Sequence, residues 1–215
     1  MNTRRHLAPL LAALLLVACS AGTGSRSASV SGPGTTPTPA RQLTPIEQLG
    51  KTGTPVEFDM QTYRLVVDGL VENPLSLSYD EVLKLPAVTL VPRLECPGFF
   101  VDIAEWKGPL VRTLLEKAGV KPGANQVEFY DGDPEPYHKT LTLDEALVDD
   151  TCVAYQVNGQ TLPVEHGYPL RLVVGSKLGS YWVKWLVRIE VKQGDVSADP
   201  RSPVVADFPR VSPPS

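Results

Sequence analysis

Cys96 is the residue with the most chemical potential in this chain. It stands in the stretch LECPGFF at 94–100, and His166, Arg171 and Lys184 follow farther along, in HGYPLR at 166–171 and VKW at 183–185. A thiolate is a soft metal ligand, and cationic side chains neutralise phosphate or other anions. A soft metal held inside an anionic organic cofactor needs both. The sequence therefore predicts a redox site, provided that the fold brings these residues together.

The cysteines also allow a different interpretation. In an exported protein, Cys96 and Cys152 would first suggest a disulfide bond. Their contexts differ, because Cys152 lies in the apolar run TCVAY at 151–155, where a thiol can serve as a small core residue. Cys96 instead follows a predicted strand and precedes Pro97, where its side chain can face a cleft. The residues alone leave both interpretations open.

The two cations present a related choice. Arg171 begins an apolar run, and Lys184 lies between apolar residues in another predicted strand. A buried cation is costly without an anionic partner, so the glycine-containing connection at 175–179 and these cations indicate a shared anion site. A solvated strand face is the alternative. For His166 taken alone, a surface or turn position is the usual interpretation.

Several function classes are not expected. The formal net charge is −4 and no block of basic residues occurs, so nucleic acid is not a predicted partner. The chain has no phosphate-binding loop, no nucleophile elbow, and no Cys-x-x-Cys or His-Glu-x-x-His motif. A Cys-x-x-Cys-His haem attachment site is also missing.

The N-terminal residues have the pattern of a targeting segment. Arg4 and Arg5 precede an apolar stretch at 7–18 that is too short for a permanent membrane span. The stretch ends in LVACS at 16–20, which resembles a bacterial lipobox, so we expect Cys19 to be lipidated after removal of a signal peptide at 1–19. An ordinary secretory signal is the alternative. The arginine pair also resembles a twin-arginine export signal. The protein is thus expected at the extracytoplasmic face of a bacterial membrane, held by a lipid anchor.

The remaining chain divides by composition. Residues 20–55 are rich in Ser, Gly, Thr and Pro and predict a flexible tether, and residues 196–215 predict a Pro-rich disordered tail. A single domain is expected at 56–195. Predicted strands lie at 63–69, 88–94, 127–130, 152–157, 170–174 and 182–191, and predicted helices at 78–83, 109–118 and 142–147. Because these do not alternate as βαβ units, the fold class is α+β, mixed, with a largely β core and short helices.

Segments spread over residues 63–191 resemble the molybdopterin-binding domain of the sulfite oxidase family. The matching stretches are LEC at 94–96, WKGPL at 106–110, LLEKAGVKPGA at 114–124, AYQVNGQTLP at 154–163, EHGYPLRLVV at 165–174 and VKWLVRI at 183–189. The resemblance implies that Cys96 is the catalytic thiolate that ligates molybdenum. It implies that His166 and Arg171 surround the pterin and its phosphate. It also implies that Trp182, Val183 and Lys184 bind the cofactor, partly through their backbone.

The same resemblance implies an oxidoreductase that carries molybdenum-molybdopterin. Its activity would be oxygen-atom transfer on a small oxyanion or sulfoxide-like substrate, with electrons exchanged with a separate partner such as a cytochrome or a quinol-linked membrane protein. The sequence departs from the sulfite oxidases proper at Trp182, where a small hydroxyl residue is common, and after Cys96, where Ala-Gly-Asn is usual. An Arg-Asn-His-like segment is also missing around 53–62. The alternative is a cofactor-free lipoprotein binding module that keeps the fold, with Cys96 idle or bonded to Cys152.

Overall fold

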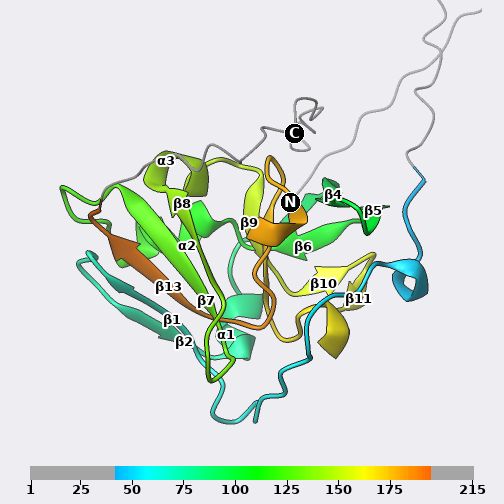
Figure 1. Ribbon diagram of the computed structural model, residues 1–215. Helices are drawn as coiled ribbons and strands as arrows, with labels where there is room; N and C mark the ends of the chain where they lie inside the picture. Colours follow the sequence, from blue (N-terminus) through cyan, green and yellow to red (C-terminus); the bar gives the residue numbers. More distant parts are fainter. Residues whose placement is uncertain (1–41, 195–215) are drawn as a thin grey trace, which may run out of the picture. The chain divides into compact units, whose positions relative to one another are not determined.

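The structure, a computed structural model, describes residues 42–194 and consists mostly of strands with a few short helices (Figure 1). The predicted α+β class with a largely β core is confirmed. The predicted signal peptide at 1–19, the tail at 196–215 and most of the predicted tether lie outside the described residues. None of the described helices is long and apolar enough to cross a membrane.

The largest sheet has five strands in the order β2-β1-β13-β7-β8. Their bounds are β1 (Leu65–Gly69), β2 (Leu75–Leu77), β7 (Gln126–Asp131), β8 (His138–Thr142) and β13 (Leu186–Lys192). Strands β1 and β13 run parallel, whereas the other neighbours are antiparallel. Along β7 every second side chain is buried, as the two-residue period of a strand with one face toward the core requires.

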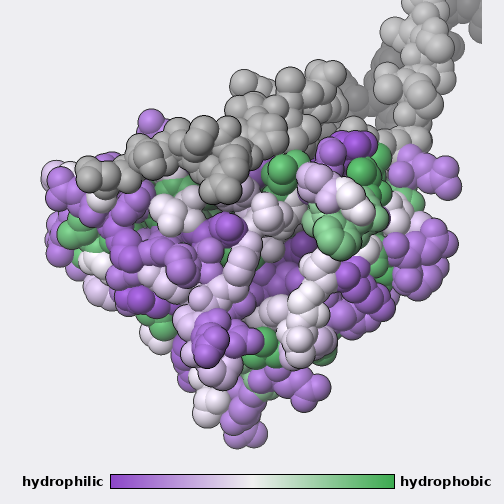
Figure 2. All heavy atoms as spheres, in the orientation of Figure 1, coloured by the Kyte–Doolittle hydropathy of each residue, from purple (hydrophilic) through white to green (hydrophobic). Residues whose placement is uncertain are grey.

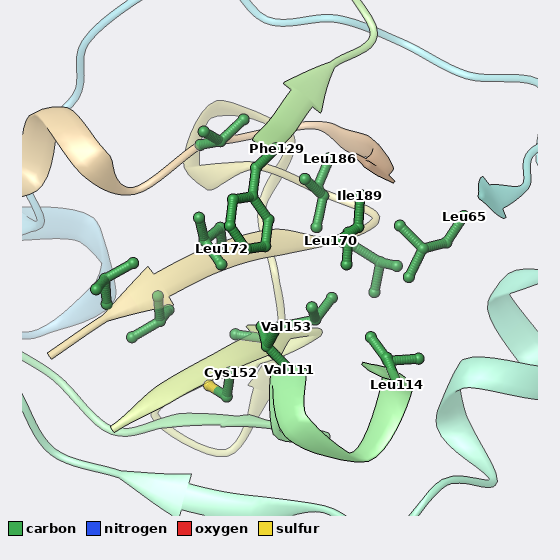
Figure 3. Close-up of a cluster of buried hydrophobic side chains, with 14 of the residues drawn as sticks. Leu65, Val111, Leu114, Phe129, Cys152, Val153, Leu170, Leu172, Leu186 and Ile189 are labelled. Atoms are coloured by element: carbon green, nitrogen blue, oxygen red, sulfur yellow. The ribbon is translucent and has the colours of Figure 1, made fainter. Parts of the chain in front are cut away.

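Helix α2 (Val111–Ala118) covers the core with the four side chains that the helical period places on one face. These are Val111, Leu114, Leu115 and Ala118. Figure 3 shows α2 residues, Phe129 of β7 and Leu186 and Ile189 of β13 gathered around one apolar cluster. The predicted helix is therefore confirmed, and Gly119 ends it with a φ of 70°.

The other two helices start where the sequence predicts. Helix α1 (Tyr79–Leu83) begins at Ser78 and α3 (Leu143–Ala146) begins at Thr142. In each, the hydroxyl of the capping residue accepts the backbone N–H of a glutamate three residues on, and that glutamate accepts the N–H of the capping residue. The capping-box spacing, a Ser or Thr followed by a Glu three residues later, thus fixes both starts.

Smaller sheets carry the residues of interest. One has the order β11-β10-β6-β3, and the other two are the pairs β12-β9 and β4-β5. Their bounds are β3 (Val88–Leu90), β4 (Arg93–Cys96), β5 (Phe100–Ile103), β6 (Trp106–Gly108), β9 (Thr151–Ala154), β10 (Gln156–Val157), β11 (Gln160–Thr161) and β12 (Arg171–Val174). Cys96 is the last residue of β4 and Arg171 is the first of β12, so both lie at strand ends.

Two predicted strands are interrupted and a third is shorter. The run at 88–94 forms β3 and the start of β4, and the run at 152–157 forms parts of β9 and β10. The predicted strand at 182–191 was wrong over its first four residues, because the 3-10 turn η3 (Gly179–Tyr181) leads into a loop in which Trp185 has a φ of 55°. Lys184 therefore lies in a loop and not in a strand.

The folded part extends toward the N-terminus beyond the predicted boundary at residue 56. The backbone N–H of Thr44 donates to the carbonyl oxygen of Ile103 at 2.7 Å, and Leu49 is buried. Residues 42–55 look like tether in the sequence because their apolar residues are isolated among Thr, Pro and Gly. Long-range hydrogen bonds, which composition does not reveal, hold them to the domain.

Candidate functional site

Cys96 lies where β4 ends and a tight turn begins. The backbone N–H of Phe99 donates to the Cys96 carbonyl oxygen at 3.0 Å, which closes the turn. The Cys96 side chain is half-buried, and its Sγ lies so close to Gly179 that a Cβ on that glycine would be 2.5 Å from the sulfur. Gly179 therefore lets η3 pack directly on the sulfur atom.

The two cysteines do not form the disulfide that the alternative interpretation allows. Both are free, and Cys152 is fully buried in β9 opposite Val173. Burial raises the pKa of the Cys152 thiol well above its ordinary value, so it stays protonated. Cys152 thus acts as the small core residue that its apolar context predicts.

The two cations that the sequence predicts act on Cys96, together with one carboxylate that it does not predict. Burial raises the pKa of the Cys96 thiol, whereas the positive charges of Arg171 and Lys184 favour its thiolate. The negative charge of Asp102 opposes them. The fold therefore brings one sulfur and two cations, from three distant segments, into electrostatic range of one another.

Arg171 is a buried cation. Its side chain is 5% exposed, and its guanidinium carbon lies 4.9 Å from the ring centroid of Trp106 and 5.5 Å from that of Trp182. Its Nη1 donates to the carbonyl oxygen of His166 at 3.2 Å. Burial lowers the pKa of Arg171 to about 10, so it stays positively charged at neutral pH. Within residues 42–194, no carboxylate lies within ion-pair distance of it.

Three buried side-chain nitrogens, one of them on Arg171 itself, have no hydrogen-bond partner among the described residues. They are Trp106 Nε1, His166 Nε2 and Arg171 Nε. Protein interiors leave few such groups unpaired, and an unpaired buried charge is more costly still. An anionic group rich in hydrogen-bond acceptors would satisfy both requirements. The residues present therefore fit a bound organic anion with a soft metal beside Cys96.

His166 supplies a neutral imidazole to this cluster. It ends the 3-10 turn η2 (Val164–His166) and is 1% exposed. Burial, and then the charge of Arg171, lower the pKa of His166 to about 4, so the ring is uncharged at neutral pH. Gly167 follows with a φ of 109°, and a Cβ there would be 3.1 Å from the Cβ of Arg171 and 3.2 Å from the Cα of Lys184. This glycine therefore lets the three predicted residues approach one another.

The buried imidazole gives the cofactor-free protein a defined pH dependence. The folded pKa of His166, about 4, lies below the ordinary value of 6.5, so the unfolded chain takes up the proton first as the pH falls. The free energy of unfolding should therefore be highest above pH 6.5 and decrease toward pH 4, by on the order of 2 kcal/mol from this residue. Urea denaturation across this range measures the effect. His166→Gln should flatten the profile, and an unchanged slope would contradict the assignment.

Lys184 lies at the edge of the cluster. Its Nζ donates to the carbonyl oxygens of Thr52 and of Glu165, the latter at 3.0 Å. Burial, and then the charge of Arg171, lower the pKa of Lys184 to about 8. Its ammonium group also lies 4.7 Å from the ring centroid of Trp185. Lys184 is therefore mostly charged at neutral pH and close enough to act on the Cys96 sulfur.

Trp182 and Val183 hold the loop in place. The indole N–H of Trp182 donates to the carbonyl oxygen of Val174 at 2.8 Å and to that of Lys177 at 3.2 Å. The carbonyl oxygen of Val183 accepts the backbone N–H of Leu172 at 2.8 Å. The Trp182 ring thus packs against Arg171, while its N–H donates to the carbonyl oxygens of Val174 and Lys177. The backbone contacts to a cofactor that the resemblance implies for these residues stay a prediction.

Sequence reasoning missed three residues of the site. Trp106 was recognised only as part of a matching stretch, and Gly179 only as part of a glycine-containing connection. Tyr137, which is 45% exposed, precedes β8; its hydroxyl donates to the carbonyl oxygen of Ser180, next to Gly179. Burial, Tyr181, Asp131 and Cys96 raise its pKa, so the phenol stays protonated. No sequence signal singled out this tyrosine, because the β7–β8 connection folds back on η3 only in three dimensions.

Gly179→Ala tests the close contact at the sulfur. The added Cβ would lie 2.5 Å from Cys96 Sγ and 2.8 Å from a methyl group of Leu94, so either the sulfur or η3 must move. We expect metal content or turnover to fall by about 100-fold, because a displacement of about 1 Å in a reacting site has this effect. Metal analysis and activity measure it. Gly159→Ala, where a Cβ meets nothing within 4 Å but the φ of 75° strains the backbone, is the control and should lose some stability without losing metal.

A surface groove lies apart from this cluster. It has a volume of about 380 Å³ and is lined by residues of α2 together with Val120 and Leu147. None of the predicted site residues lines it. The groove therefore does not belong to the Cys96 site.

Comparisons with known proteins agree with this geometry. Residues 51–199 match the family described as oxidoreductase molybdopterin binding domain. The chain is 31% identical to the protein-methionine-sulfoxide reductase catalytic subunit MsrP of Gluconobacter oxydans, over 73% of this chain and 58% of that protein. It is 29% identical to sulfite oxidase of Arabidopsis thaliana, over 69% of this chain and 47% of that protein. With nitrate reductase [NADH] of Ulva prolifera the identity is 30%, over 71% of this chain and 22% of that protein.

A solved structure supports the same assignment. The sulfane dehydrogenase SoxCD from Paracoccus pantotrophus superposes with a TM-score of 0.63 and 28% identity, over 76% of this chain and 53% of that chain. The chain thus spans between about a fifth and somewhat over half of these relatives' lengths. The predicted resemblance is confirmed: the chain belongs to the oxidoreductase molybdopterin-binding domain family of the sulfite oxidase superfamily, whose cofactor is molybdenum-molybdopterin.

Proposed function

We propose that this protein is an exported, lipid-anchored enzyme that reduces a sulfoxide to a thioether with electrons from a separate partner. The observation that carries the proposal is the half-buried Cys96 thiol within range of the buried Arg171 cation, which has no ion-pair partner among residues 42–194. The reaction takes up two electrons and two protons, breaks the sulfur–oxygen bond, and releases the thioether and water. Small oxyanions remain the alternative substrate class.

The residues of the site have distinct tasks in this proposal. Cys96 would ligate the metal, and His166, Arg171, Trp106 and Lys184 would hold the pterin and its phosphate through the N–H groups and charges described above. When bound, the cofactor supplies two-electron redox chemistry and a site for the transferred oxygen. The Tyr137 hydroxyl keeps its proton at neutral pH and donates it to Ser180, so its oxygen can accept a hydrogen bond at the exposed side of the site.

The surface beside Cys96 favours a sulfoxide with an apolar substituent. Phe99 is 83% exposed at the tip of the β4–β5 hairpin, and Val101 is also exposed. Figure 2 shows green surface where this hairpin lies in Figure 1, next to purple surroundings. The similarity to the methionine sulfoxide reductase subunit of Gluconobacter oxydans supports methionine sulfoxide as the substrate to test first.

The proposed location rests on the N-terminal sequence. Lipidation at Cys19 would hold the domain at the extracytoplasmic face of the membrane, where a cytochrome or a quinol-linked protein could supply electrons. The lipobox-like stretch at 16–20 supports this location. Labelling with a radioactive fatty acid should mark the wild-type protein, and Cys19→Ala should remove the label.

Metal, pterin and activity measurements on the purified protein test the enzyme. In a host that makes the cofactor, we expect molybdenum and pterin near one per chain, and oxidation of a reduced viologen dye that depends on methionine sulfoxide. Oxidation of sulfite with ferricyanide, without sulfoxide reduction, would favour the oxyanion class. Protein that folds without molybdenum in that host would contradict the proposal and favour a cofactor-free binding module.

A further inference from the structure

A segment that precedes the main sheet lies against the Cys96 site. Residues 44–52, here called the strap, include the 3-10 turn η1 (Ile46–Gln48) and are drawn in blue and cyan beside β5 and β11 in Figure 1. Thr44 exchanges two hydrogen bonds with Ile103 of β5, and its carbonyl oxygen accepts the side-chain N–H of Asn158 at 2.9 Å. Leu49 packs into the core. The strap is therefore fixed at its first half.

Asp102 holds the middle of the strap. This carboxylate is 3% exposed, lies in β5 opposite Leu94 of β4, and accepts the backbone N–H of Gly50 at 2.8 Å. Its charge also acts on Cys96 and on Arg171, so it lies within electrostatic range of both. A Cβ on Gly50 would lie 2.2 Å from ring atoms of Phe100, so the strap can approach β5 this closely only with glycine at that position.

The far end of the strap meets two other segments of the site. Lys51 pairs with the carboxylate of Glu165 at 2.9 Å, and Glu165 directly precedes His166. The carbonyl oxygen of Thr52 accepts a hydrogen bond from Lys184. The strap thus joins the Cys96 hairpin, the His166 turn and the Lys184 loop, which lie far apart in the sequence.

We propose that the strap is a clamp for the cofactor, and that Asp102 is the positioning residue that latches it. The clamp keeps the three cofactor-holding segments in their relative places and slows cofactor loss. This inference rests on the cofactor role assigned to the Cys96 site. Coupling between two sites is reciprocal, so a strap that increases cofactor affinity must itself be stabilised by the bound cofactor to the same extent.

The rate of cofactor release from the full-length, molybdenum-loaded protein tests whether the strap slows cofactor loss. Asp102→Ala removes the latch, and Gly50→Ala displaces the strap while leaving Asp102 intact. Both should release pterin about tenfold faster or more, the effect of losing a buried hydrogen bond to a charged group. Asp102→Asn keeps an acceptor for Gly50 N–H and should release pterin more slowly than Asp102→Ala. The reverse order would contradict the latch.

Hydrogen exchange tests the reciprocal effect, the stabilisation of the strap by the bound cofactor. Backbone amides of residues 44–52 should exchange more slowly in the loaded protein than in cofactor-free protein from a host that lacks the cofactor.

Tyr63→Phe, which removes a buried hydrogen bond to the carbonyl oxygen of Leu186, is a stability control for the release experiment and should release pterin at the wild-type rate. A simple loss of stability would accelerate release in all three variants alike.

The outcomes separate the two levels of inference. Wild-type release rates in both Asp102→Ala and Gly50→Ala, or equal exchange of the strap in loaded and cofactor-free protein, would overturn the clamp while leaving the enzyme intact. Wild-type protein without molybdenum in a cofactor-producing host would instead remove the proposed function, on which the clamp depends.

Discussion

Cys96→Ser is expected to reduce turnover by at least ~100-fold, because changes even to residues that support metal ligands cost about 10- to 100-fold. Molybdenum that is also bound by dithiolene sulfurs prefers a soft thiolate ligand. Serine would offer a harder oxygen donor in its place. Cys96 is only half-buried, so the fold should survive the change. Turnover with reduced dye and methionine sulfoxide, together with circular dichroism and metal analysis, gives the result.

Cys152→Ala is the matched control for this change. It removes the other free thiol of the described residues, which is fully buried in β9. We expect a loss of unfolding free energy of about 1 kcal/mol from the small cavity, with normal turnover. Comparable turnover in the two variants would show that Cys96 does not ligate the metal.

Arg171→Met should have opposite effects on cofactor binding and on stability. In the loaded protein, loss of the buried cation should weaken cofactor retention by about 100-fold or more, since truncating one partner of a buried charge pair costs about 2–5 kcal/mol. In the cofactor-free protein, the same change removes a buried charge without an ion-pair partner, so the free energy of unfolding should stay constant or increase by about 1–3 kcal/mol. Pterin content and urea denaturation measure the two effects.

Arg112→Met controls for the loss of an arginine as such. Its guanidinium pairs with Asp149 and donates to the carbonyl oxygen of Leu147, but it is partly exposed and remote from the Cys96 site. Retention of pterin should be normal, and stability should decrease slightly. A clear decrease in the stability of cofactor-free Arg171→Met would show instead that the contacts of the guanidinium with His166, Trp106 and Trp182 outweigh the cost of burying its charge.

Local features of the fold were readable from the sequence. Capping boxes at Ser78 and Thr142 fixed two helix starts, and Gly119 marked the end of a third helix. The Asn158-Gly159 turn joins β10 to β11, with positive φ at both residues. Each of these depends on interactions within a few residues, which the sequence displays directly.

Features that depend on distant partners were not readable. The loop at 182–185 has strand-like composition, but η3 before it and the left-handed Trp185 keep it out of the sheet. The strap resembles a tether in composition, because the residues that bind it, Asp102, Ile103 and Asn158, are each more than fifty residues away. Amino-acid composition indicates how much apolar surface a segment can bury by itself, but not which distant residues will bind it.

The site residues divide in the same way. Cys96, His166, Arg171 and Lys184 were identified because their types are unusual in apolar surroundings, and the fold brings them together. Trp106 was not assigned a role, since a tryptophan in a strand is ordinarily a core residue. Only its unpaired Nε1 and its position against Arg171 reveal the difference.

The position of β13 in the main sheet determines when the sheet can be completed. This last described strand lies in the middle of the sheet, between β1 and β7, and pairs in parallel with residues more than one hundred positions earlier. Such non-local pairing closes a long loop and slows folding. A nascent chain therefore cannot complete its central sheet before residue 192 has been translated, and Arg171 and Lys184 join Cys96 equally late. Cofactor insertion must then wait until all of these segments have been translated.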